Sequence, residues 1–252
     1  MVKFTKMEQI SKRYKNPPIQ EAVCEFRFDL EHNPEQIQIE KIFNKIKGRF
    51  PVAKKGNFHE VSVKIDIKEN KKDLIDNARE FDRFFSVDER SLVQIDGNKL
   101  SIHRLKPYTS WQEFFSAIEL VFNTYLGVTK IKSIQRIGLR YINAIEMGSS
   151  FEIEKYFNLR PNIVAELPQN ISDFNAGVVF VMENGIDGVK AQLSNQWLSH
   201  NKQRVVLDLD YFLGKPDVVK IEEVLNWLKV AHQALENIFE TVITEKTKSL
   251  FN

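Results

Sequence analysis

The sequence predicts an α+β protein whose two related halves form an antiparallel sheet covered by long helices. Residues 19–26 and 134–141 both begin with Ile-Gln, end in an aromatic residue and carry two charges at matched positions. Period-two alternation recurs after each segment, and each half ends in a long stretch of helical periodicity. We therefore expect residues 1–130 to form a β-α-β(4)-α half and residues 131–252 a β-α-β(3)-α half, within one compact structural unit.

The first half is expected to contain a leading strand, a short helix, four further strands and a long helix. An Asn-Pro pair at 33–34 predicts the start of the short helix, and Asp-Gly-Asn at 96–98 predicts a hairpin turn. Ser110 with Glu113 has the pattern of a capping box, and Gly127 ends the long helix. The predicted ranges are strands at 21–30, 61–68, 84–87, 92–95 and 100–105, helices at 34–47 and 110–127, and a polar loop at 69–80.

The second half is expected to repeat this order. Its predicted ranges are a strand at 131–145, a short helix at 151–158, strands at 174–183, 188–198 and 203–213, and a long helix after Pro216. In topology alone, this order resembles the duplicated fold of the TATA-binding protein and, more loosely, the helix-grip folds. Internal duplication of this kind implies a pseudo-twofold axis close to the two leading strands.

Composition limits the classes of protein that the chain can belong to. A net charge of +2 is too small for a general nucleic-acid coat, although the first sixteen residues are basic and are interpreted as a solvated start. A single cysteine, Cys24, excludes an intrachain disulfide and a cysteine zinc cluster. No stretch approaches the ~18–20 apolar residues of a membrane span. We expect a cytoplasmic protein without membrane association.

The strand at 131–145 carries the strongest candidate binding site. Alternation places Arg136 and Arg140 on one face and Tyr141 and Asn143 on the other, with Gly138 between the two arginines. Arginine presents a planar fork that suits phosphate and carboxylate groups, and glycine allows a ligand to approach closely. This pattern predicts an anion-binding ledge for a phosphorylated ligand, a nucleotide or a nucleic-acid backbone.

A structural interpretation of the same arginines stays open beside the functional one. Glu21 and Glu25 occupy the matched positions of the first strand, so they could face the arginines and form salt bridges. Asp208 and Asp210 share a strand face and could bind a divalent cation or form an acid/base pair. Alternatively, they form a solvated strand face or pair with Lys190 or Arg204. The five histidines are scattered, and we expect no metal site and no cofactor.

Three segments, with His232 and Thr244, together resemble one family: Pro-Pro-Ile-x-Glu-Ala-Val at 17–23, Arg-x-Gly-Leu-Arg-Tyr-x-Asn at 136–143, and Leu-Asp-Leu-Asp at 207–210. It is a sporadically distributed, functionally uncharacterised prokaryotic family of proteins of about this length. The resemblance spans nearly the whole chain. It implies a single cytoplasmic module from mobile or defence-related loci, and it supplies no catalytic residues.

The leading functional hypothesis is a non-enzymatic binding protein that recognises a phosphorylated ligand, a nucleic acid or a protein partner. No catalytic set is assembled in the sequence, and an arginine-bearing strand is present. The alternative is a phosphate-directed hydrolase or nuclease that uses Glu21 and Glu25 with Arg136 and Arg140. A third hypothesis is a subunit of a defence system whose motifs are purely structural. A homodimer is compatible with each of them.

Overall fold

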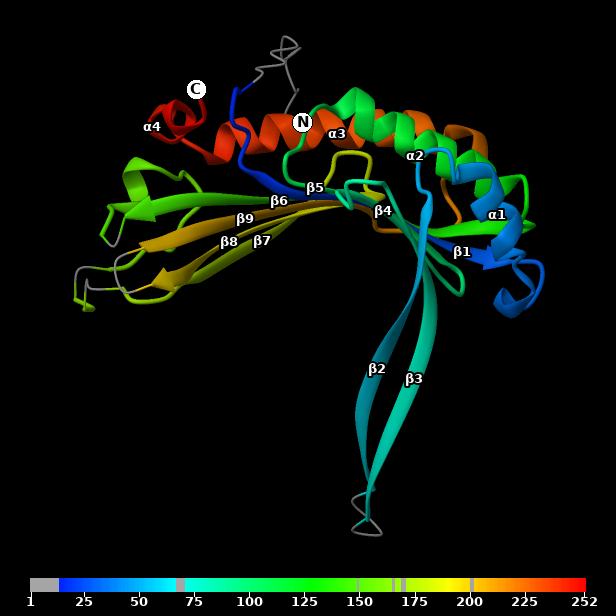
Figure 1. Ribbon diagram of the computed structural model, residues 1–252. Helices are drawn as coiled ribbons and strands as arrows, with labels where there is room; N and C mark the ends of the chain where they lie inside the picture. Colours follow the sequence, from blue (N-terminus) through cyan, green and yellow to red (C-terminus); the bar gives the residue numbers. More distant parts are fainter. Residues whose placement is uncertain (1–13, 67–70, 149, 165, 169–170, 200–201) are drawn as a thin grey trace. The chain divides into compact units, whose positions relative to one another are not determined.

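The computed structural model describes residues 14–66, 71–148, 150–164, 166–168, 171–199 and 202–252 (Figure 1). Nine strands form a single antiparallel sheet in the order β2-β3-β4-β5-β1-β6-β9-β8-β7. The strands are β1 (Ile19–Leu30), β2 (Val52–Asp66), β3 (Lys71–Phe85), β4 (Ser91–Asp96), β5 (Lys99–Leu105), β6 (Ile131–Gly148), β7 (Asn175–Val181), β8 (Asp187–Ser199) and β9 (Lys202–Leu213). The α-helices are α1 (Ile39–Ile46), α2 (Trp111–Leu126), α3 (Val224–Val242) and α4 (Glu245–Lys248). Most of the basic start, residues 1–13, lies outside the described residues.

The predicted fold class, two β-α-β(3–4)-α halves with a sheet covered by long helices, was wrong. The structure is mostly strand, and its four described helices have 8, 16, 19 and 4 residues. Residues 71–80, expected in a loop, belong to β3, whose backbone pairs with β2 along its whole length. The helix expected at 151–158 is only a 3₁₀ turn, Ile153–Lys155. Backbone ladders do not require apolar side chains, so a polar segment became a strand where the local pattern predicted a loop.

The chain divides into two compact units, whose boundaries along the chain fall within β1, β6, β9 and α3. The first unit comprises Met1–Ala22, Leu139–Phe212 and Asn226–Asn252. The second unit comprises Val23–Gly138 and Leu213–Leu225. The strands β1 and β6 therefore each contribute residues to both units.

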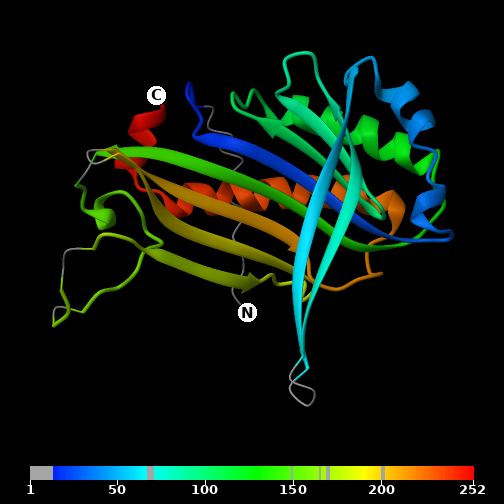
Figure 2. The ribbon, with the colours of Figure 1, turned by 60° about the horizontal axis from the view of Figure 1, so that its bottom comes forward.

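Aromatic packing between β1 and α2 forms the core of the second unit. The Phe26 ring lies 4.8 Å from Phe122, and the Phe28 ring lies 5.0 Å from Tyr125. All four side chains are buried, as the alternation in β1 and the periodicity of α2 predicted. The Ser110 hydroxyl accepts a hydrogen bond from the Glu113 N–H at 3.2 Å, which confirms the predicted start of α2. The two strands β2 and β3 run side by side as a ribbon, and only residues 82–85 of β3 pair with β4 (Figure 2).

Buried residues of α3, β6, β8 and β9 form the core of the first unit. One carboxylate lies inside this core: Asp187 is 4% exposed. It accepts hydrogen bonds from the Tyr211 hydroxyl at 2.9 Å, the Trp227 indole N–H at 3.0 Å and the Asn184 amide at 2.6 Å. Because these three donors compensate the buried charge, the group ties the start of β8 to β9 and α3.

Candidate functional site

Glu25, one of the predicted site residues, lies at the centre of a cluster of cations in the second unit. Its carboxylate is 3.0 Å from Nη1 of Arg136, 2.8 Å from Nζ of Lys99 and 3.0 Å from Nε of Arg27. Burial acts to raise the pKa of the Glu25 carboxyl, but Lys99, Arg27 and Arg136 together hold that pKa below its ordinary value. The carboxylate is therefore ionised at neutral pH and forms ion pairs with all three cations.

Gly138 makes room for a neighbouring side chain of the same strand. A Cβ atom at this position would meet Nη1 of Arg136 at 2.7 Å, well inside van der Waals contact. We predicted that Gly138 would leave space for a ligand, but the guanidinium of Arg136 occupies this space. This arrangement directs Arg136 toward Glu25.

Arg140 lies in the first unit and has a different partner from the one that the matched strands predicted. Its Nε and Nη2 donate to the two carboxylate oxygens of Asp208 at 2.7 and 2.6 Å. This bidentate pair raises the pKa of Arg140, and the charges of Asp210 and Glu21 add to the effect. The partner of Asp208 is therefore neither Lys190 nor Arg204, and Arg204 donates instead to Gln196 at 2.7 Å.

Tyr141 and Asn143, two further predicted site residues, are buried in the first unit. The Tyr141 hydroxyl lies 3.0 Å from Nδ1 of His232. The Asn143 amide donates to the carbonyls of Leu207 at 3.1 Å and Tyr141 at 3.3 Å. Within the second unit Glu25 thus pairs with Arg136, and within the first unit Arg140 pairs with Asp208. Tyr141 and Asn143 make hydrogen bonds inside the first unit.

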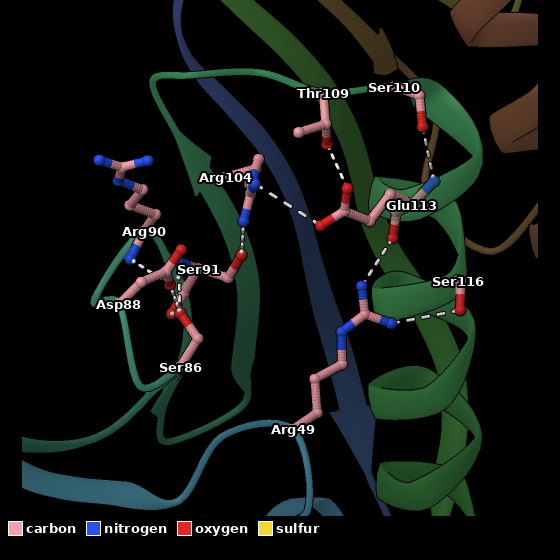
Figure 3. A network of polar contacts seen from close by, with 10 residues as sticks. All are labelled: Arg49, Ser86, Asp88, Arg90, Ser91, Arg104, Thr109, Ser110, Glu113 and Ser116. Atoms are coloured by element: carbon pink, nitrogen blue, oxygen red, sulfur yellow. Dashed lines mark hydrogen bonds and ion pairs between the residues drawn. The ribbon is translucent and has the colours of Figure 1, made fainter.

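A pocket in the second unit brings together polar residues that sequence analysis did not assign to a site (Figure 3). Its volume is about 370 Å³, at the small end of the usual range for ligand sites. Five elements supply its walls: the turn after α1, the β3–β4 turn, the start of β4, β5 and the first turn of α2. The lining residues are Arg49, Ser86, Val87, Asp88, Ser91, Arg104 and Glu113.

Arg104 is the most buried cation of this pocket, with 11% of its side chain exposed. Nη1 donates to the Ser91 hydroxyl at 2.9 Å, and Nη2 lies 3.5 Å from the Glu113 carboxylate. Nε is buried and has no hydrogen-bond partner among the described residues. A desolvated guanidinium N–H without an acceptor is costly, so Arg104 is held at the pocket at a cost in stability.

Arg49 reaches the same pocket from the turn that follows α1. Its guanidinium donates to the Glu113 carbonyl at 2.8 Å and to the Ser116 hydroxyl at 3.2 Å, both on α2. Burial and the nearby charge of Arg104 lower the pKa of Arg49, while the charge of Glu113 acts in the opposite direction. Two cations therefore repel each other across one partly desolvated pocket.

The β3–β4 turn forms the remaining wall and is held by its own hydrogen bonds. The Ser86 hydroxyl donates to Asp88 at 2.6 Å, and the Arg90 N–H donates to the same carboxylate oxygen at 3.1 Å. These bonds lower the pKa of Asp88, the one from Ser86 most strongly. Glu89 adopts a left-handed φ of 55° in this turn. The turn is therefore fixed without using either arginine of the pocket.

No local signal could have revealed this pocket from the sequence. Its two arginines are far apart in the chain and belong to no shared motif. The only residues that sequence analysis marked were Ser110 and Glu113, for their role in starting α2. The other pocket residues are brought together by strand pairing: for example, pairing of β4 with β5 places Ser91 opposite Arg104.

Two other kinds of site can be assessed over the described residues. No helix in this part of the chain is long and apolar enough to cross a membrane. Within the same residues, no three His, Cys, Asp or Glu side chains gather where they could hold a metal ion. The pocket offers arginines, hydroxyls and two carboxylates.

Comparison of the chain with models of known protein families and with curated proteins finds no match. The resemblance of the motifs at 17–23, 136–143 and 207–210 to a prokaryotic family therefore stays a prediction. The proposals that follow depend on the geometry of the described residues.

Proposed function

We propose that this protein binds a ligand carrying a phosphate monoester in the pocket between Arg49 and Arg104, without converting it chemically. The observation that carries the proposal is the pair of guanidinium groups that line one pocket in partly desolvated positions. A phosphate dianion would offset the repulsion between them.

The carboxylate of Glu113 accepts a hydrogen bond from the Thr109 hydroxyl, but its contact with Arg104 is loose. Its distance of 3.5 Å from Nη2 of Arg104 exceeds the ~2.7–2.9 Å of a good charge-assisted hydrogen bond. Glu113 is also 45% exposed, so its side chain can turn toward solvent when a phosphate oxygen approaches Arg104. Glu113 then acts as a weak internal competitor for the ligand.

The predicted ledge of Arg136 and Arg140 is a weaker candidate for the same role. Both arginines already bind carboxylates at 3.0 Å or less, so a ligand would first have to break these ion pairs. Engagement of Glu25 by three cations likewise gives no support to the hydrolase or nuclease alternative. A nucleic-acid or protein partner, a cytoplasmic location and a defence role stay predictions.

Calorimetric titration with inorganic phosphate and with O-phosphoserine tests the proposal, with serine as the uncharged comparison. Arg104→Met and Arg49→Met should each weaken binding about ten- to a hundredfold, because a hydrogen bond to a charged group contributes about 1.5–3 kcal/mol. Glu113→Gln should tighten binding, since it removes the competing charge. Raised salt should weaken binding in the wild type.

Arg90→Gln provides the matched control, because it removes one positive charge from the same turn. In Figure 3 the Arg90 guanidinium points away from Arg49 and Arg104, so binding should stay near that of the wild type. Circular dichroism would show that each variant is folded. Unchanged phosphate affinity in folded Arg104→Met and Arg49→Met, or weaker binding by Glu113→Gln, would contradict the proposal.

A further inference from the structure

The outer edge of β7, the last strand in the sheet order, has backbone groups available for pairing. Among the described residues, β8 is the only strand paired with β7. The Met182 N–H donates to the Asp187 carbonyl, and backbone groups of an antiparallel strand alternate between its two sides. Phe180, Val178 and Ala176 therefore face β8. The backbone N–H and C=O groups that point outward belong to Asn175, Gly177, Val179 and Val181.

Four consecutive apolar side chains of β7, Val178 to Val181, are exposed. Val178 and Phe180 are 40% and 46% exposed, while Val179 and Val181 are 60% and 79% exposed. The strand contains no charged residue and no proline, which are the usual means by which edge strands avoid pairing. At the other end of the strand order, β2 does carry such charges, including Lys54 and Lys55.

We propose that β7 pairs antiparallel with β7 of a second copy of this chain, so that a symmetric dimer forms by extension of the sheet. A twofold contact places each residue near residues of its own strand, so a charged edge would repel itself. The uncharged sequence of β7 meets its own copy without such a cost. This inference is independent of anion binding in the pocket.

Charges that flank β7 select the register of the pairing. A twofold axis at Val178 would place Asp173 of each copy opposite Glu183 of the other, and like charges in opposing strands are destabilising. An axis at Val179 places Asn175 opposite Glu183 and avoids this repulsion. In this register Val179 pairs with its own copy and Gly177 with Val181, which gives about six backbone hydrogen bonds.

The same register continues the buried layer of the first unit into the second copy. Val178 pairs with Ala191 of β8 and Phe180 with Val189, and both β8 residues are fully buried. Directly opposed residues of neighbouring strands point to the same face of a sheet. Val178 of one copy therefore meets Phe180 of the other on the core side, where both would lose exposed apolar surface.

Sedimentation across the micromolar range tests the dimer. The wild type should sediment at about twice the chain mass of 29.4 kDa, and Val179→Lys should be monomeric because two charges would meet on the axis. Val230→Lys is the control, since Val230 is an equally exposed valine on α3. A wild type that is monomeric throughout, or a dimeric Val179→Lys, would overturn the proposal.

Disulfide cross-linking tests the register. The only native cysteine, Cys24, is buried, so an introduced thiol reacts without background. In the proposed pairing the two Val179 Cα atoms lie about 5.5 Å apart, within the ~4.4–6.8 Å that a disulfide spans. Val179→Cys should give a covalent dimer on mild oxidation. Preferential cross-linking of Val178→Cys would overturn the register, and cross-linking of neither variant would overturn the dimer.

Discussion

Replacing Glu25 by glutamine should lower the free energy of unfolding by about 2–3 kcal/mol at neutral pH. Three cations surround the carboxylate at 2.8–3.0 Å, and its side chain is only 16% exposed. The amide keeps the size of the side chain but leaves these cations without their shared counterion. Removing one partner of a fully buried pair costs about 3–5 kcal/mol, and we expect less here because Arg27 reaches solvent.

Thermal unfolding followed by circular dichroism measures this loss. One kcal/mol shifts the midpoint by about 2–4 °C in a chain of this size, so Glu25→Gln should unfold about 5–10 °C below the wild type. Asp29→Asn is the matched control on the same strand, because Asp29 pairs with an exposed lysine, Lys132, at 3.2 Å. Its midpoint should stay close to that of the wild type.

The pH dependence of this difference gives a second, sharper test. The pKa of Glu25 is lower in the folded protein than its ordinary value of 4.5. Such a group stabilises the fold above its unfolded pKa, and this stabilisation is lost as the pH falls through the folded pKa. The gap between the wild type and Glu25→Gln should therefore be full at neutral pH and close in acid. Equal midpoints at neutral pH, or a gap that persists in strong acid, would refute the reasoning.

Two further predictions concern buried groups. Asp187→Ala should cost about 3–5 kcal/mol in urea unfolding, because it leaves the buried donors of Tyr211 and Trp227 without their acceptor; a midpoint like that of the wild type would contradict this role. Burial raises the pKa of the Cys24 thiol, so a thiol reagent should modify it only after denaturant is added. Rapid labelling of the folded protein would show that β1 opens.

Local patterns predicted those elements whose burial follows a short period. Alternation in β1 placed Phe26 and Phe28 on the buried face, and Ser110 marked the start of α2. The same reasoning failed for β3, since a polar segment gives no local sign that another strand will pair with it. It also overestimated the helices, because residues 151–158, predicted to be a helix, form only a 3₁₀ turn.

The sequence by itself determined which faces of the strongly periodic segments are buried, because each side chain's hydrophobicity acts at its own position. Only the tertiary structure decided which polar groups meet. Arg140 pairs with Asp208, and Arg49 shares a pocket with Arg104. These contacts between polar side chains depend on strand order and register, which are set by backbone pairing between segments far apart in the chain. For the same reason, the exposed edge of β7 became visible only when the structure showed that β7 ends the sheet.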